Sequence, residues 1–178
     1  MHPYIHDIDL NAEGKLSEDQ LTKLKKITRA RGLVGWLLVV CFLFLGGLTI
    51  IPLLGGMFEG RMLIFMWVAE ILYIIGFLYG IKIISEQNKN KKMLDKPKVR
   101  KIVAKPTKIG AAVAIPHVPV MGGMMLIAHL KAGTIKLEGK KYGSLNGIYP
   151  IVEDGGLAEF HVVDFGFDTI KGVIVNYL

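Results

Sequence analysis

The amino-acid sequence predicts an α+β membrane protein, in which a two-helix transmembrane hairpin precedes a small, mainly-β cytoplasmic domain built as a sheet or barrel. Three observations predict it: two long apolar runs, positive charge concentrated on one side of them, and short apolar runs between turn residues in the C-terminal part. The 178-residue chain is 52% hydrophobic yet has a net charge of +7. This combination is unusual for a soluble domain and points to a membrane.

The two apolar runs cover residues 33–56 and 62–81. The first contains no charged residue and the second contains one, Glu70. At about 1.5 Å per residue, a helix of either length can cross a hydrocarbon layer of about 30 Å. Because the connection between them is short, we expect an antiparallel hairpin over 33–84.

Positive charge flanks one end of this hairpin. Residues 15–31 and 82–108 hold 16 of the 22 Lys and Arg residues, whereas the hairpin tip has only Arg61 beside Glu59. The positive-inside rule then places both termini in the cytoplasm and the hairpin in the inner or plasma membrane. Since the charge is concentrated beside the spans, we expect no nucleic-acid-binding face.

The same charges form a basic collar that can attract anionic lipid head groups, at roughly 1 kcal/mol per residue near the surface. A simpler interpretation is that the collar only fixes the orientation of the hairpin. The residues expected to face lipid are Lys25, Lys26, Arg29, Arg31, Lys89, Lys91 and Lys92.

The N-terminal segment, residues 1–32, contains the start signal of a helix. Ser17 and Gln20 have the spacing of a capping box, and Leu16 with Leu21 has that of a hydrophobic staple. We therefore expect a helix from Glu18 that lies at the membrane interface or leads into the first span.

A calcium loop is the alternative interpretation of these letters. Asp9, Asn11 and Glu13 fall at the first three ligand positions of an EF-hand loop, but Gln20 stands where a bidentate carboxylate is needed. An entering helix is not expected either, because the preceding stretch is short and contains Pro3. The helix cap is the favoured interpretation.

After a basic linker or frayed helix extension over 85–108, residues 109–178 predict the β domain. Short apolar runs at 111–115, 124–130, 134–138, 147–152, 157–163 and 172–177 alternate with Gly and Asp, which predicts five or six strands. The expected core comprises Ile135, Leu137, Ile148, Ile151, Phe160, Val162, Val173 and Val175.

Residues 109–130 leave a rival interpretation open. The stretch is uncharged and lies between two lysines, so it could be a third span that places the C-terminus outside. Its central Pro and Gly residues favour strands and loops instead. Its side chains His117, Met121, Met124, Met125 and His129 have a spacing that could hold a soft metal or haem, as could His2 and His6, but we expect them in core and loop.

Glu70 lies near the centre of the second span, where an acid is costly and by default a candidate functional residue. Reflection about the hairpin tip places it level with residue 48, close to Thr49 and Pro52. Pro52 deprives the Leu48 carbonyl of its helical partner, so protonated Glu70 could donate to that carbonyl or to Thr49. Contact with a partner subunit and a proton or ion relay are the alternatives.

Small residues in both spans predict close helix packing, either within the hairpin or between copies of the chain. They are Gly46, Gly47, Ala69, Gly76 and Gly80.

No catalytic constellation, phosphate loop or zinc-spaced cysteine set is found in the sequence, so an enzyme is the least supported class, and no cofactor or metal is assigned. Asn11, Gly14, Leu16, Ser17 and Gln20 form an NxxGxLSxxQ segment. With the hairpin and β domain that follow, the chain resembles a set of uncharacterised small bacterial membrane proteins and, more distantly, NfeD-like proteins. The resemblance implies this architecture and brings no catalytic site.

The function expected from these features is that of a membrane-anchored interaction or accessory protein, a subunit or scaffold of a larger membrane assembly. Its partners would be anionic lipids and a protein partner or further copies of the chain. The alternative is a homo-oligomeric transport or conductance element that uses Glu70.

Overall fold

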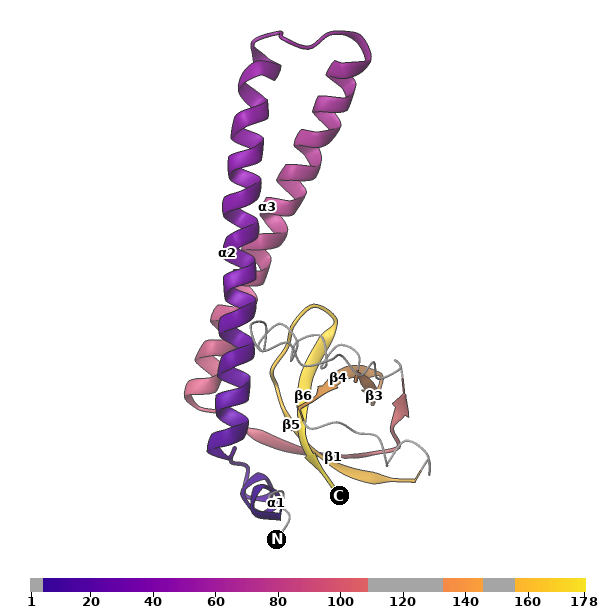
Figure 1. The fold of residues 1–178 in the computed structure, drawn as a ribbon. Coiled ribbons are helices and arrows are strands. Elements are labelled where there is room, and N and C mark those ends of the chain that lie inside the picture. The colour runs from indigo at the N-terminus through magenta and orange to yellow at the C-terminus, as the bar shows by residue number, and fades with distance from the viewer. Residues whose placement is uncertain (1–4, 109–132, 146–155) are drawn as a thin grey trace, which may run out of the picture. The chain divides into compact units, whose positions relative to one another are not determined.

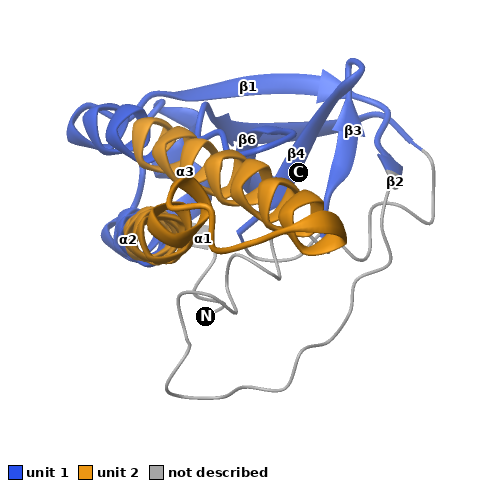
Figure 2. Ribbon diagram, turned by 90° about the horizontal axis from the view of Figure 1, so that it is seen from above, with its two compact units in different colours: residues 1–30, 87–178 blue, residues 31–86 orange. Residues whose placement is uncertain are grey.

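The computed structural model describes residues 5–108, 133–145 and 156–178 (Figure 1). It confirms the α+β class, with two long apolar helices followed by a curled mixed sheet that forms a half-barrel. The chain divides into two compact units, residues 31–86 and residues 1–30 with 87–178 (Figure 2).

Two long helices supply the hairpin. Helix α2 runs Glu18–Leu54 and helix α3 runs Gly60–Asp95, and both are long and apolar enough to cross a membrane. The helix predicted from Glu18 is therefore continuous with the first apolar run. Gly56 ends α2 with a φ of 69°, while Met57 N–H donates to the Pro52 carbonyl (3.1 Å) and Gly56 N–H to that of Leu53 (3.4 Å). This is a Schellman cap, which favours glycine.

The segment 85–108 contains more regular structure than a linker. Helix α3 continues to Asp95, so the proposed helix extension is present, and strands β1 (Val99–Ala104) and β2 (Thr107–Lys108) follow. Pro97 lies just after the helix end, where a residue without a backbone N–H cannot continue the helix. Strand β1 is not recognisable from the sequence, because Arg100 and Lys101 interrupt its alternation of apolar and polar residues.

The sheet has the strand order β1-β5-β6-β4-β3-β2. The remaining strands are β3 (Ile135–Leu137), β4 (Lys140–Ser144), β5 (Ala158–Val163) and β6 (Ile170–Tyr177). Strands β4 and β6 pair in parallel and all other neighbours are antiparallel. Glu138 and Gly139, with φ values of 49° and 79°, form the tight turn between β3 and β4.

The strands predicted at 134–138, 157–163 and 172–177 correspond to β3, β5 and β6. Strand β4 was not predicted because its sequence, KKYGS, contains no apolar run. The expected strands at 111–115, 124–130 and 147–152 lie outside the described residues, as do the possible third span over 109–130 and the histidines and methionines within it.

Two apolar clusters stabilise the unit that contains the sheet. One joins Tyr142 and Phe160 with residues of β1, β3, β5 and β6, and the other packs Leu24 and Ile27 of α2 and Leu94 of α3 against the opposite face. Six predicted core residues are buried, namely Ile135, Leu137, Phe160, Val162, Val173 and Val175, whereas Ile148 and Ile151 lie outside the described residues. The N-terminal parts of α2 and the C-terminal part of α3 are thus built into the β domain's core.

Candidate functional site

The one acidic residue within the apolar runs lies between the two helices. Glu70 is only 5% exposed and its Oε1 contacts the Thr49 hydroxyl. The same hydroxyl oxygen lies 2.9 Å from the Leu45 carbonyl and 3.3 Å from the Gly46 carbonyl. Thr49 has one hydroxyl hydrogen. If Glu70 is in its acid form, it can donate to Thr49 while Thr49 donates to Leu45, and both groups are satisfied.

Of the two partners that the sequence offered Glu70, the structure therefore gives Thr49 and not the Leu48 carbonyl. Pro52 lies in the last turn of α2, where its own carbonyl accepts the hydrogen bond that closes the helix end. The structure brings Glu70 and Thr49 together and gives Pro52 a part in the turn. Whether the pair has a functional role stays a prediction.

Three of the predicted small residues make room for contacts within the hairpin. A Cβ added at Gly76 would lie 2.4 Å from the Phe42 ring, and one at Gly80 would lie 3.0 Å from the Gly35 carbonyl oxygen. At Gly46 an added Cβ would lie 3.5 Å from Glu70 Oε2. The helices approach closely along this seam, as small residues permit.

The other two small residues behave differently. Gly47 has no atom within 4 Å of an added Cβ, so it lies on the outer surface of α2, and Ala69 is half-buried. Gly35, which the sequence reasoning missed, contributes its backbone to the crossing with Gly80. Gly35 could have been found from the sequence, because it precedes Gly46 by eleven residues and so lies on the same face of the helix.

Large apolar side chains cover the outside of both helices. Trp36 is 59% exposed, and most of the apolar residues between Leu33 and Ile81 are similarly open. The polar pair of Thr49 and Glu70 faces inward instead. The hairpin thus has its apolar residues outside and its polar residues inside, the reverse of a soluble protein's arrangement.

Six of the seven collar residues are exposed: Lys25, Lys26, Arg29, Lys89, Lys91 and Lys92. Arg31 is the exception, because it is buried and its guanidinium forms an ion pair with Glu86 at 3.2 Å. The lipid-facing position expected for Arg31 is therefore wrong. Arg31 lies on the face of α2 that meets α3, so its guanidinium contacts Glu86.

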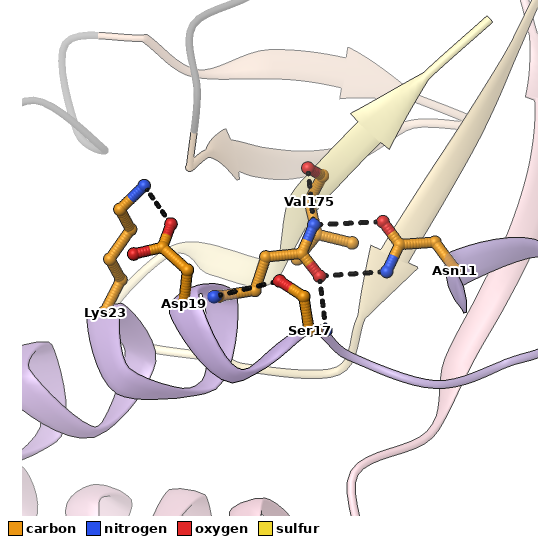
Figure 3. Close-up of polar contacts among 6 residues, drawn as sticks. Asn11, Ser17, Asp19, Lys23 and Val175 are labelled. Atoms are coloured by element: carbon orange, nitrogen blue, oxygen red, sulfur yellow. Dashed lines mark hydrogen bonds and ion pairs between the residues drawn. The ribbon is translucent and has the colours of Figure 1, made fainter. Parts of the chain in front are cut away.

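The NxxGxLSxxQ segment forms a buried polar corner (Figure 3). The side chains of Asn11 and Gln20 exchange hydrogen bonds of 2.9 and 3.0 Å, and Gln20 Nε2 also donates to the Val175 carbonyl of β6 (3.4 Å). Ser17 N–H donates to Gln20 Oε1 (3.1 Å) and Gln20 N–H to Ser17 Oγ (3.3 Å). The predicted capping box is confirmed.

The structure also corrects the prediction that no helix precedes this cap. Helix α1 covers Ile5–Ala12, and Gly14, with a φ of 80°, ends it in a Schellman motif. Asp9 is exposed on α1, Asn11 is paired with Gln20, and Glu13 pairs with Lys15 at 2.8 Å. These side chains do not converge as calcium ligands, and among the described residues no three His, Cys, Asp or Glu side chains form a candidate metal site.

Sequence reasoning missed one charged cluster on β1 and β5. His161 is buried, its Nε2 lies 3.2 Å from Glu159 Oε1, and Glu159 also forms an ion pair with Lys101 of β1. The hydrogen bond from Lys101 is the main cause that lowers the pKa of Glu159 below its ordinary 4.5. Glu159 and His161 are two residues apart on β5, so strand alternation places them on one face. Lys101 joins them only through the register between β1 and β5, which no spacing in the sequence indicates.

Comparisons with known proteins add no relative. No protein-family model, curated protein or solved structure matches this chain.

Proposed function

We propose that this protein is a membrane-anchored accessory protein, a subunit or scaffold of a larger membrane assembly, in which the hairpin anchors and the β domain engages a protein partner. The observation that carries the anchor is the arrangement of the hairpin, with exposed apolar side chains outside and Glu70 against Thr49 inside. Exposure of this apolar surface to water would be unfavourable, whereas its contact with lipid chains is not.

The length of the hairpin fits one bilayer. Gly35 and Gly80 are in contact, so Trp36 and Tyr79 lie at the same level, both exposed, where an interfacial aromatic belt is expected. From Trp36 to the end of α2 at Leu54 the helix rises about 27 Å, close to a hydrocarbon core of about 30 Å. Glu70 then lies about 14 Å from the tip, close to the bilayer midplane.

The exposed collar supports an orientation with both termini in the cytoplasm. Arg29 precedes Trp36 by only seven residues of α2, whereas Lys89 and Lys92 follow Tyr79 by ten and thirteen residues of α3. Because surface potentials decay over about 8 to 10 Å, Arg29 would contact anionic lipid more strongly than the distal lysines. The distal lysines therefore remain available to a partner.

A homo-oligomeric transport or conductance element that uses Glu70 ranks second. Such a role needs a polar path from Glu70 along the hairpin. Between Glu70 and the Arg31–Glu86 pair the described seam is filled by Phe42 against Gly76 and by Val39 against Gly80. These apolar contacts favour an anchor over a path within one hairpin.

Purification of the full chain in mild detergent, with mass spectrometry of co-eluting proteins, tests the proposal. A defined heteromeric complex supports it, and a homogeneous ring of this chain alone overturns it in favour of the second candidate. Orientation is tested in a Cys41→Ala background, because Cys41 is itself exposed. A cysteine at Phe58 should react with an impermeant thiol reagent in intact cells, and one at Leu178 should react only after permeabilisation.

A further inference from the structure

Strand β1 forms one edge of the sheet. It pairs with β5 from Val99↔Val163 to Ala104↔Ala158 without a bulge, and no other described strand lies on its outer side (Figure 2). An edge strand presents backbone N–H and C=O groups that can pair with another chain.

Three backbone hydrogen bonds show which groups of β1 point outward. Val99 N–H donates to the Gly14 carbonyl (3.2 Å), so it points away from β5. At the other end, the N–H and C=O of Glu159 both bond Leu178 (3.0 and 2.9 Å), so Glu159 and its partner Val103 form a non-hydrogen-bonded pair. In an antiparallel ladder such pairs alternate, so the backbone groups of Lys101 and Val103 point to the outer side of β1, where no described strand pairs with them.

The exposed side chains along this edge include one apolar residue, Val103, and several lysines. The Val103 side chain is 56% exposed. Exposed lysines flank the strand: Lys96, Lys98, Lys101 and Lys105. Lys101 is partly neutralised by Glu159, whereas no ion pair of Lys98 or Lys105 is found in the described part of the chain.

We propose that the outer edge of β1 binds an extended acidic segment of a partner protein by strand addition, with its backbone on Lys101 and Val103 and its carboxylates on Lys98 and Lys105. The inference rests on the proposed function, since it names the surface and chemistry of that partner. Strand addition takes its affinity from main-chain hydrogen bonds and its specificity from alternate side chains.

The lysines also exclude other occupants. Edge lysines protect a sheet from pairing with itself, because a second copy of this chain would bring like charges opposite one another. An acidic segment is attracted by the same lysines. The lysines therefore disfavour pairing between copies of this chain and favour an acidic partner. Anionic lipid could meet the lysines, but it cannot pair with the backbone of Lys101 and Val103.

The test uses the full chain in phosphatidylcholine nanodiscs and a fluorescent peptide of alternating Glu and Val with blocked ends. Val103→Pro removes an outward N–H and no β1–β5 hydrogen bond, so an edge strand should tolerate it. Val103→Thr is the matched control that keeps the N–H. We expect Val103→Pro to weaken peptide binding about tenfold or more and Val103→Thr to change it less than about twofold.

Two further readouts keep the test independent of the folding of the proline variant. Lys98→Glu with Lys105→Glu should weaken binding about tenfold at low salt, with a smaller effect at high salt. Peptide binding should also slow hydrogen exchange at the Lys101 and Val103 amides of the wild-type chain. Phosphatidylserine nanodiscs without peptide should not slow it.

The inference is overturned if Val103→Pro binds the peptide like the wild type, if exchange at Lys101 and Val103 is unchanged by bound peptide, or if phosphatidylserine alone slows it. The proposed function fails on different readouts. If the chain does not float with vesicles, the hairpin is not an anchor, and if only copies of this chain co-purify, there is no protein partner. If the edge of β1 does not bind the peptide, flotation and co-purification of a partner are still expected.

Discussion

The side chains of Asn11 and Gln20 exchange two hydrogen bonds, of 2.9 and 3.0 Å, and so join α1 to the first turn of α2. Gln20 uses its other donor on Val175 and its other lone pair on Ser17, while Asn11 uses its second donor on the Lys15 carbonyl (2.8 Å). Neither amide has an unused donor. A buried network of this kind is stable only when it is complete.

We expect Asn11→Ala to destabilise this corner by about 1 to 3 kcal/mol, because it leaves Gln20 with an unpaired donor and a weakened acceptor in a buried position. Glu13→Ala is the control, since it removes only an exposed ion pair with Lys15 and should change stability by less than about 1 kcal/mol. Urea unfolding of the full chain in detergent measures both. Equal effects of the two substitutions would contradict the role of the amide pair.

The capping box predicts a metal-independent effect. Ser17→Ala removes the acceptor of the Gln20 N–H and should cost about 0.5 to 2 kcal/mol, the same with and without calcium. Asp9→Ala should leave stability unchanged, because Asp9 is exposed on α1. A calcium-dependent shift in melting temperature that Asp9→Ala abolishes would restore the calcium-loop interpretation.

The pair of Lys101 and Glu159 predicts a loss of stability in acid. Since the folded protein lowers the pKa of Glu159 below 4.5, the unfolded chain binds the proton more tightly. The pair's contribution is therefore fully present above about pH 5 and is lost as the pH falls through the folded value. Glu159→Gln should flatten the dependence of unfolding free energy on pH below about 5, and Lys101→Gln should do the same. A Glu159→Gln curve parallel to that of the wild type would show that the pair contributes nothing.

The sequence predicted those parts of the fold that depend on local pattern. The apolar runs, the cap at Ser17 and the strands β3, β5 and β6 each have a signal within a few residues. Strand β1 and the pairing of its Lys101 with Glu159 depend on register between distant segments, which no local spacing reveals. Arg31 shows the same limit, because its burial depends on which face of α2 meets Glu86.

At the candidate site, reflection about the hairpin tip correctly brought Glu70 level with Thr49, because antiparallel helices of equal rise keep that register. It did not choose between the Thr49 hydroxyl and the Leu48 carbonyl, since that choice depends on helix rotation. Helix α1 was missed because Pro3 precedes it and does not interrupt it.

The close contact of α2 and α3 at their glycines predicts that an added methyl group is harmful at some positions and harmless at others. Gly80→Ala would bring its Cβ within 2.9 Å of Val39 Cγ2 and 3.0 Å of the Gly35 carbonyl oxygen, and the backbone atom cannot move cheaply. We expect a loss of about 1 to 3 kcal/mol. Gly47→Ala, with no neighbour within 4 Å, is the matched control and should be neutral in a single hairpin. A large loss at Gly47 would indicate that copies of the chain pack on that face.

The contact between Thr49 and Glu70 predicts that substitution of Thr49 destabilises the hairpin more than substitution of Glu70. Thr49→Val leaves Glu70 buried without a partner and should cost about 1 to 3 kcal/mol. Glu70→Leu should cost less than about 1 kcal/mol, because the Thr49 hydroxyl keeps the Leu45 carbonyl at 2.9 Å. The double variant removes both polar groups and should recover most of the loss from Thr49→Val.

Tryptophan fluorescence measures this cycle within the hairpin, since the only two tryptophans, Trp36 and Trp67, lie on α2 and α3. Unfolding in detergent is followed for both single variants, the double variant and Glu70→Gln, which keeps a donor to Thr49. If Glu70→Leu proves as harmful as Thr49→Val, the carboxyl has a further partner, such as a second subunit. If Glu70→Gln leaves the hairpin stable but abolishes a measured ion flux, Glu70 must ionise to act, and the transport element replaces the anchor as the leading function.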